Sequence, residues 1–139
     1  MQTIKDVMSR DVQVISPNGT IREAALRMLK GNFGMMPVEE NDRMIGAVSD
    51  RDIAIHAVAQ GKDTNTQVRD VMSEGIICAF ENDSVADAAK LMAEHQVRRL
   101  PVLNQDKRLV GIVSLGDFAV EKKDLAVAGE ALAEISQPE

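Results

Sequence analysis

The sequence predicts an α/β (α+β) chain made of two tandem β-α-β-β-α repeats, related by a pseudo-twofold axis and followed by one extra C-terminal helix. Three observations support this fold class. Most of the first half of the chain recurs about 64 residues later. Each repeat contains a helix that begins at a hydroxyl residue suited to capping it. Each repeat also contains two short apolar segments on either side of a polar turn.

The duplication can be followed residue by residue. Residues 4–8 (IKDVM) recur as 68–72 (VRDVM), and residues 20–25 (TIREAA) recur as 84–89 (SVADAA). The offset is 64 in both cases and becomes 65 further along the chain. The one inserted residue lies in the polar stretch 103–108, between two predicted strands. Length changes cost least in such a turn, so the repeat reflects a shared structure.

The elements of the first repeat follow from local patterns. We expect a short strand at 12–15, then a helix from Thr20, with Glu23 completing a capping box and Gly31 ending the helix. The buried stripe of this helix is formed by Ala24, Ala25, Met28 and Leu29. Strands at 35–39 and 44–49 form a hairpin, and a second helix runs over 50–60.

The second repeat has the same order of elements. We expect a strand at 76–80, a helix at 84–95, strands at 100–103 and 109–114, and a helix from about Leu115. These patterns predict repeat 1 at 1–60, a linker at 61–67, repeat 2 at 68–120 and a helical extension at 121–139. One repeat of this size would be marginally stable alone, so we expect the pair to form one folding unit.

The extension at 121–139 has no counterpart in the first repeat. A helical stripe is formed by Leu125, Ala128, Leu132 and Ile135, although Gly129 weakens the helix. This helix is expected to pack on its own domain. A contact in a dimer is the alternative.

Composition narrows the class of partner and the compartment. The formal charge of −6, a pI near 4.9 and an aromatic content of 2% argue against nucleic acid as the partner. Cys78 is the single cysteine, which fits a reducing cytoplasm. No apolar stretch is long enough to cross a bilayer, so we expect a cytoplasmic protein without membrane contact.

Each repeat opens with D-V-M, continues with an h-P-V strand (h, an apolar residue) and ends with G-h-V-S-x-x-D. In this order, and doubled, these motifs resemble the paired CBS (cystathionine-β-synthase) domain family, in particular its stand-alone two-repeat bacterial members. The resemblance covers residues 4 to about 120. It implies a regulatory module that binds an adenosine-containing ligand in clefts between the repeats and assembles into a disc-like homodimer.

The two S-x-x-D motifs are the predicted ligand sites. Ser49 and Ser114 can act as helix caps, with Asp52 and Asp117 three residues on, and capping alone is the alternative function. The resemblance implies that each aspartate holds the ribose hydroxyls, while each serine contacts phosphate at a helix N-terminus.

The residues expected to contact phosphate differ between the repeats. Arg98 and Arg99 precede the P-V strand of repeat 2, whereas Gly34 and Met35 precede it in repeat 1. Adjacent residues on a strand point to opposite faces, so we expect only one arginine to reach a given ligand, and a solvated pair is the alternative. In repeat 1, we expect Arg51 to supply part of the positive charge that Arg98 and Arg99 supply in repeat 2. We therefore expect the Asp117 cleft to bind a phosphate-bearing ligand more tightly.

The resemblance also implies that apolar residues and backbone of the opposite repeat hold the base. These positions are equally ordinary core positions. For the Asp117 cleft they are Val12, Gln13, Val14 and Phe33. For the Asp52 cleft they are Ile76, Ile77, Cys78 and Val97.

No set of residues in the sequence predicts catalysis or a metal site. His56, His95 and Cys78 have no metal-ligand spacing, and no nucleophile, base and orienting group occur in a known pattern. We therefore expect a non-catalytic sensor of AMP, ADP or ATP that needs no cofactor and regulates an unknown partner protein. The alternatives are an interaction module with degenerate clefts, a sensor of S-adenosylmethionine or an NAD-type ligand, and a redox or metal-linked protein using Cys78 or the histidines.

Overall fold

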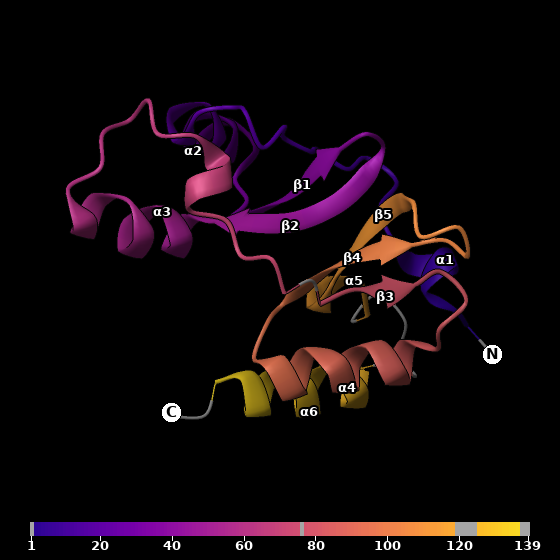
Figure 1. Ribbon diagram of the computed structural model, residues 1–139. Coiled ribbons are helices and arrows are strands. Elements are labelled where there is room, and N and C mark those ends of the chain that lie inside the picture. Colours follow the sequence, from indigo (N-terminus) through magenta and orange to yellow (C-terminus); the bar gives the residue numbers. More distant parts are fainter. Residues whose placement is uncertain (1, 76, 119–124, 137–139) are drawn as a thin grey trace. The chain divides into compact units, whose positions relative to one another are not determined.

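The computed structural model describes residues 2–75, 77–118 and 125–136 (Figure 1). Its contacts divide the chain into two compact units. Unit 1 combines Met1–Val12 with Ile77–Glu139, and unit 2 is Gln13–Ile76. Each unit has its own hydrophobic core and mixes helices with a small sheet, which confirms the predicted α+β class.

Unit 2 contains the hairpin and the two helices predicted for the first repeat. Strands β1 (Met35–Glu40) and β2 (Arg43–Ser49) pair antiparallel. Their two-residue turn, Asn41 and Asp42, has positive φ at both positions, as tight hairpins with the natural twist require. Helix α2 (Ile21–Gly31) precedes the hairpin and α3 (Asp50–His56) follows it.

Helix α2 begins at the predicted cap, Thr20, with only the bond from the Glu23 N–H of the predicted capping box, and it ends one residue later than predicted. Thr20 Oγ1 accepts from the Glu23 N–H at 3.1 Å, and the buried residues Ile21, Ala24 and Met28 face the core of unit 2. The left-handed residue that ends the helix is Asn32 (φ 56°), so the prediction of Gly31 as terminator was wrong by one position. Leu29, predicted to be buried, is 77% exposed, and Ala25 is also exposed.

The second helix of this unit is shorter than the predicted 50–60. Helix α3 stops at His56, because Ala57 leaves the helical region at φ −120° and ψ −68°. A 3₁₀ turn, η1 (Val58–Gln60), follows and closes on the left-handed Gly61. The unit ends with a second 3₁₀ turn, η2 (Val68–Asp70).

Unit 1 has the same order of elements around a three-stranded sheet. Strand β3 (Ala79–Phe80) lies parallel to β4 (Arg99–Leu103), which pairs antiparallel with β5 (Leu109–Ser114). Helix α4 (Val85–His95) is capped by Ser84 and ends at the left-handed Gln96. Helix α1 (Ile4–Val7) and helix α5 (Leu115–Phe118) complete the sheet-bearing part of the unit.

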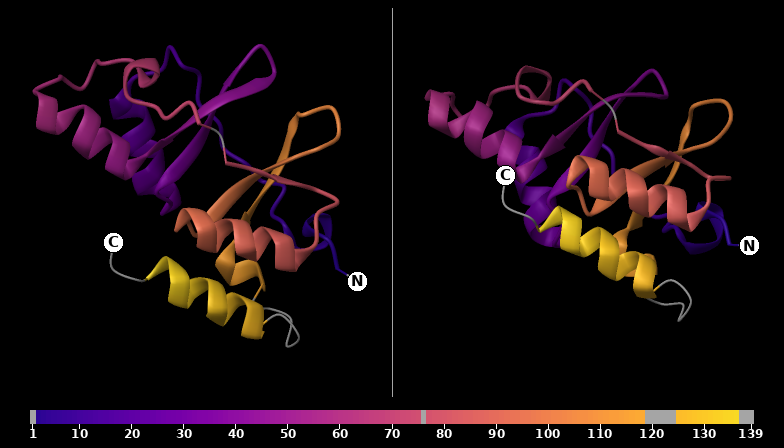
Figure 2. Two further views of the ribbon diagram at one scale, coloured as in Figure 1. Left: turned by 60° about the horizontal axis from the view of Figure 1, so that its bottom comes forward. Right: turned by 90° about the horizontal axis from the view of Figure 1, so that it is seen from below.

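The C-terminal helix α6 (Leu125–Ile135) packs beside α4 and α5 in unit 1, as expected for a helix that packs on its own domain (Figure 2). Ala131 is buried and Ile135 is partly buried against the core. Leu132, a member of the predicted stripe, is 42% exposed. The side chains of Leu125 and Ala128 lie outside the described residues.

The strand predicted at 12–15 is reduced to one bridge in the described chain, between Ile15 and Val38. One reason is that the Arg27 guanidinium donates to the Val14 carbonyl at 2.7 Å and so occupies an acceptor that a ladder would use. After Ile15, Pro17 cannot donate to a ladder and the Gly19 N–H bonds Ser16 O, which turns the chain. In the second repeat, only Ala79 and Phe80 of the predicted 76–80 form a strand, and Ile76 lies outside the described residues.

The opening segment of each repeat lies in the unit that holds the hairpin of the other repeat. Ser73 exchanges two backbone hydrogen bonds with Ala47 of β2, at 2.9 and 3.0 Å. Ser9 exchanges two with Ile112 of β5, at 2.8 and 2.9 Å. Each compact unit therefore consists of most of one sequence repeat together with the opening segment of the other repeat.

A glycine in each hairpin permits this exchange. A Cβ built on Gly46 would stand 2.6 Å from Ser73 O, and one on Gly111 would stand 2.8 Å from Ser9 O. The glycine of each G-h-V-S motif is therefore needed for close backbone approach.

Replacing Gly46 with alanine should lower the free energy of unfolding by about 1–3 kcal/mol, because the new methyl group must displace backbone. Urea unfolding measures this. Gly75→Ala is the matched control, since nothing lies within 4 Å of its Cβ position. Equal effects of the two substitutions would show that the close approach does not constrain the fold.

Candidate functional site

The first S-x-x-D motif lies where β2 runs into α3, in unit 2. The Ser49 N–H donates to Asp52 Oδ2 at 2.9 Å, and the Asp52 N–H donates to Ser49 Oγ at 3.0 Å. These two bonds form a complete capping box, which fixes the direction of the Asp52 carboxylate.

Two further groups face the other oxygen of Asp52. The Ser73 hydroxyl donates to Asp52 Oδ1 at 3.4 Å, and His56 Nε2 lies 3.8 Å from the same oxygen. The Asp52 side chain is 15% exposed and that of His56 is 50% exposed. Neither neighbour of Asp52 was predicted from the sequence. Ser73 had a signal, because it recurs as Ser9 at the offset of 64, and His56 stands four residues after Asp52 on the helix.

The second motif occupies the matching junction of β5 and α5 in unit 1. The Ser114 N–H donates to Asp117 Oδ2 at 2.7 Å, so this carboxylate has the same orientation relative to its strand as Asp52. Both aspartates are partly buried. The two motifs thus share the bond from the serine N–H to the aspartate carboxylate, and at Ser49 the complete capping box makes helix capping part of the motif's role.

Backbone pairing confirms that the arginines and their counterparts occupy equivalent positions. Arg99 stands opposite Ser114 in the β4–β5 ladder, and Met35 stands opposite Ser49 in the β1–β2 ladder. The Leu115 N–H bonds Arg98 O, just as the Asp50 N–H bonds Gly34 O. Arg98 and Arg99 are both exposed, as is Arg51 on α3. Their contact with phosphate stays a prediction.

Most of the residues predicted to hold the base are half-buried, so they are more exposed than the residues of the hydrophobic cores. Val14 and Phe33 are half-buried in unit 2, and the exposed Gln13 accepts from Arg27 through its side-chain oxygen. Half-buried positions in unit 1 are Val12, Ile77, Cys78 and Val97. Each predicted pocket combines residues of both units and stays a prediction.

Cys78 does not have the surroundings of an activated thiol. Burial, and secondarily the charge of Asp83, raise the pKa of the Cys78 thiol above its ordinary value. Among the residues that the structure describes, no three histidine, cysteine, aspartate or glutamate side chains cluster as metal ligands. In the same part of the chain, no helix is both long and apolar enough to span a membrane.

The chain belongs to the CBS domain family, whose model matches residues 4–58 and 68–123. Two such domains, each with an S-x-x-D motif at the end of its hairpin, make this protein a CBS domain pair. It is 47% identical to the CBS domain-containing protein YhcV of Bacillus subtilis over 98% of this chain and 96% of that one. It is 36% identical to hypoxic response protein 1 of Mycobacterium tuberculosis, over 86% and 84% of the two chains.

Solved structures agree with this assignment. The crystal structure of Hypoxic Response Protein I with two coordinated zinc ions has a TM-score of 0.79 and 35% identity, covering 86% of this chain and 98% of that one. The CBS domain pair of protein MJ0100, in complex with 5-methylthioadenosine and S-adenosyl-L-methionine, has a TM-score of 0.76 and 28% identity, covering 86% and 94%. CBSX2 in complex with AMP, at 24% identity, a TM-score of 0.75 and coverage of 99% and 100%, shows the shared fold.

Ser49→Ala should lower the free energy of unfolding by about 1 kcal/mol, because it removes the acceptor for the Asp52 N–H. Urea denaturation without ligand measures this loss. Ser136→Ala, at an exposed position after α6, is the control. No loss beyond the control would mean that the hydroxyl does not stabilise α3.

Cys78 should react with a disulfide reagent at pH 7 more slowly than free cysteine, because its raised pKa leaves less thiolate. Absorbance of the released thiol gives the rate, with urea-unfolded protein as the reference. A rate above that of free cysteine would contradict this result and favour the redox alternative.

Proposed function

We propose that this CBS domain pair is a non-catalytic regulatory module that binds an adenosine-containing ligand of the AMP, ADP or ATP class. The observation that carries the proposal is the repeated geometry of the S-x-x-D motif. In each unit, a backbone N–H of the motif's serine orients an aspartate carboxylate that is partly buried.

The carboxylates retain acceptor capacity for a ribose. An ionised carboxylate has two oxygens with about four acceptor positions. At Asp52, the Ser49 N–H and the Ser73 hydroxyl occupy one position on each oxygen. Two vicinal hydroxyls can therefore donate to the remaining positions, which is how acidic residues hold ribose in other nucleotide-binding folds.

The relatives support an adenosine moiety without fixing the rest of the ligand. The MJ0100 domain pair binds 5-methylthioadenosine and S-adenosyl-L-methionine, which share adenosine with AMP and ATP. S-adenosylmethionine is therefore the second candidate ligand for this chain. The arginines of unit 1 favour a phosphate over a sulfonium group, because guanidinium groups pair with anions and repel cations.

Regulation would follow from differential binding to two arrangements of the module. A ligand shifts a conformational equilibrium only by its difference in affinity for the two states. We propose that two copies of the chain form a homodimer and that a partner protein responds to the ligand-induced shift in the module. No chemistry on the ligand is required for this response, and we propose that the module acts as a sensor in the cytoplasm.

Asp117→Ala should weaken binding of AMP, ADP or ATP more than Asp52→Ala does, because Arg98 and Arg99 adjoin only the Asp117 motif. Calorimetry measures both affinities, and thermal shift with the same nucleotides, S-adenosylmethionine and NADH identifies the ligand class. At a ligand concentration of 100 times Kd, binding stabilises the folded state by about 2.7 kcal/mol.

Asp87→Ala is the matched control, since Asp87 ends a further Ser-x-x-Asp sequence, Ser84 to Asp87, which caps the start of α4 and does not follow a hairpin. Equal losses from the two S-x-x-D variants would contradict the unequal sites. An unchanged melting temperature with every ligand would contradict the sensor and favour an interaction module with degenerate clefts.

A further inference from the structure

The two S-x-x-D motifs differ at the residue that follows the serine. In unit 2 this residue is Asp50, which is exposed, and in unit 1 it is Leu115, which is buried. Both occupy the same backbone position, because the Asp50 N–H bonds Gly34 O and the Leu115 N–H bonds Arg98 O, each at 2.9 Å. The motifs therefore present a carboxylate and an apolar side chain at equivalent places.

The Asp50 carboxylate lies against Gly34. A Cβ built on Gly34 would stand 2.9 Å from Asp50 Oδ2. The residue equivalent to Gly34 in unit 1 is Arg98, a cation. The two differences between the units are coupled, because a side chain at position 34 would require the Asp50 carboxylate to move.

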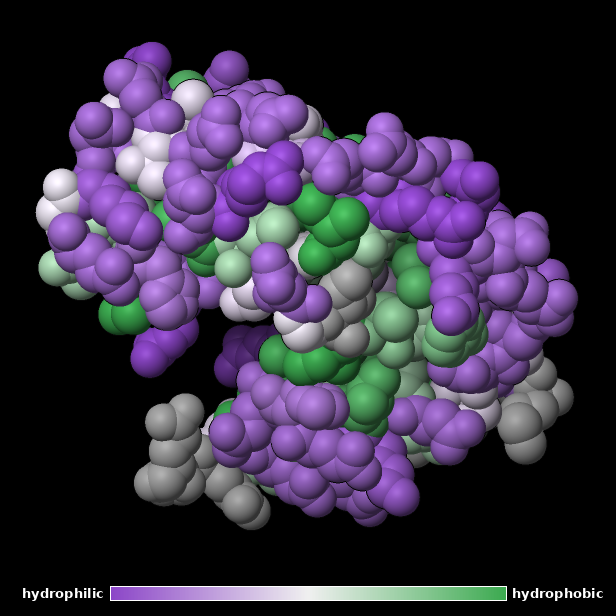
Figure 3. All heavy atoms as spheres, in the orientation of Figure 1, coloured by the Kyte–Doolittle hydropathy of each residue, from purple (hydrophilic) through white to green (hydrophobic). Residues whose placement is uncertain are grey.

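The place of Asp50 matters more than its exposure. Most of the surface visible in Figure 3 is hydrophilic, so an exposed carboxylate by itself does not indicate a role in binding. Asp50 adjoins both Ser49 and Gly34. Their counterparts in repeat 2, Ser114 and Arg98, are two of the residues expected to contact phosphate. An anion thus stands between the two positions of repeat 1 that a 5′-phosphate would approach.

The first three N–H groups of α3 all have acceptors within unit 2. The Asp50 N–H donates to Gly34 O at 2.9 Å, and the Arg51 N–H donates to Asp50 Oδ1 at 2.8 Å. The Asp52 N–H donates to Ser49 Oγ at 3.0 Å. A helix N-terminus binds an anion through N–H groups that lack such acceptors. These three groups are therefore not available to a phosphate while the arrangement persists.

The net charge beside the motif also differs between the units. Asp50 is adjacent to Arg51 and offsets its charge. Among the residues that the structure describes, none forms an ion pair with Asp50. In unit 1, Leu115 adds no charge to those of Arg98 and Arg99. Because phosphate pairs with guanidinium groups and is repelled by carboxylates, the surroundings favour phosphate in unit 1 alone.

We propose that Asp50 makes the Asp52 motif selective for an adenosine compound without a phosphate, whose 5′ group is uncharged or cationic. The Asp52 carboxylate holds the ribose, and the Asp50 carboxylate repels a 5′-phosphate. The Asp117 motif takes the phosphate-bearing ligand, so the two motifs bind different classes of adenosine compound. This inference rests on the function proposed above and adds a separate ligand class for each motif.

Adenosine and AMP differ only by the phosphate, so they are the matched pair of probes. Asp117→Ala leaves the Asp52 motif intact, and Asp52→Ala leaves the Asp117 motif intact. Calorimetry at about pH 8 keeps an imidazole such as His56 neutral. The Asp117→Ala protein should bind adenosine about fivefold more tightly than AMP, and the Asp52→Ala protein should have the reverse preference.

Asp50→Asn in the Asp117→Ala protein isolates the contribution of the charge. The amide keeps an oxygen that accepts from the Arg51 N–H and loses the negative charge. The affinity for AMP relative to adenosine should therefore rise about fivefold. The preference of the Asp117→Ala protein for adenosine should also shrink with salt, since the Debye length falls from about 10 Å at 0.1 M to about 3 Å at 1 M.

A double substitution transfers the chemistry of unit 1 to unit 2. Gly34→Arg with Asp50→Leu, again in the Asp117→Ala protein, installs the pair that Arg98 and Leu115 form in repeat 2. This protein should bind AMP more tightly than adenosine. Thermal unfolding without ligand confirms that each variant is folded, and Asp50→Asn tests the inference if the double variant is not.

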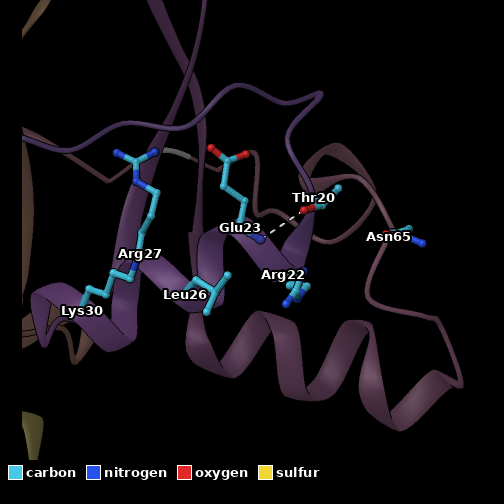
Figure 4. Close-up of a pocket in the computed structure, with 7 residues that line it drawn as sticks. All are labelled: Thr20, Arg22, Glu23, Leu26, Arg27, Lys30 and Asn65. Atoms are coloured by element: carbon cyan, nitrogen blue, oxygen red, sulfur yellow. Dashed lines mark hydrogen bonds between the residues drawn. The ribbon is translucent and has the colours of Figure 1, made fainter.

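Glu23→Gln is the matched control, since it removes one carboxylate charge from an exposed side chain of the same unit. Figure 4 shows Glu23 near Thr20 at the start of α2, in the groove that runs along this helix. Gly34 and the Asp50 carboxylate lie beyond the other end of α2. In the Asp117→Ala protein, this control should leave the ratio of the two affinities unchanged.

The possible failures are distinguishable. An affinity for AMP that equals or exceeds that for adenosine in the Asp117→Ala protein would overturn the inference and leave the sensor standing. The same conclusion would follow if this protein bound neither probe while the wild-type chain bound AMP. A wild-type chain that binds no adenosine compound would overturn the proposed function as well.

Discussion

Both units depend on the close approach of one backbone segment to a glycine in each hairpin. Gly46 leaves room for Ser73 O, and Gly111 leaves room for Ser9 O. Each approach allows a pair of backbone hydrogen bonds to form beside the glycine. Because the segment that docks comes from the start of the other repeat, neither unit is complete within one repeat of the sequence. Each unit therefore needs segments from both repeats, so the fold requires the duplicated sequence.

The same docking shapes the candidate site of unit 2. Ser73 forms the bridge to Ala47 through its backbone, and its hydroxyl then reaches Asp52 Oδ1. The strand that receives the segment ends at Ser49, whose N–H holds the other carboxylate oxygen. The aspartate is thus held from two sides by groups whose positions the hairpin determines. Capping and ligand binding use different acceptor positions of one carboxylate, so the two roles are compatible.

The sequence predicted elements whose signals are local and missed those that depend on distant partners. Both hairpins and both capped helices were predicted within a residue or two, since turns and caps act over a few residues. The strand at 12–15 was overestimated, because Arg27 takes the Val14 carbonyl from 13 residues away. Helical spacing placed Leu132 in one stripe with Ile135, but it does not reveal the direction from which α4 approaches, and the buried residue of α6 is Ala131. The S-x-x-D motifs were found by repetition, whereas His56 beside Asp52 appears in one repeat only.

The two repeats share their backbone pairing and differ mainly in the side chains at equivalent positions. Glycine, serine and aspartate are retained at the hairpin and the S-x-x-D motif, where the glycine makes room for the docked segment and the serine N–H orients the aspartate carboxylate. Gly34 and Met35 give way to Arg98 and Arg99 at positions whose backbone pairing is identical. Leu26 likewise gives way to Lys90 on a helix of the same length. One backbone geometry therefore carries different surface chemistry in each unit. A duplicated scaffold of this kind can carry different ligand-binding chemistry in each unit without changing the fold.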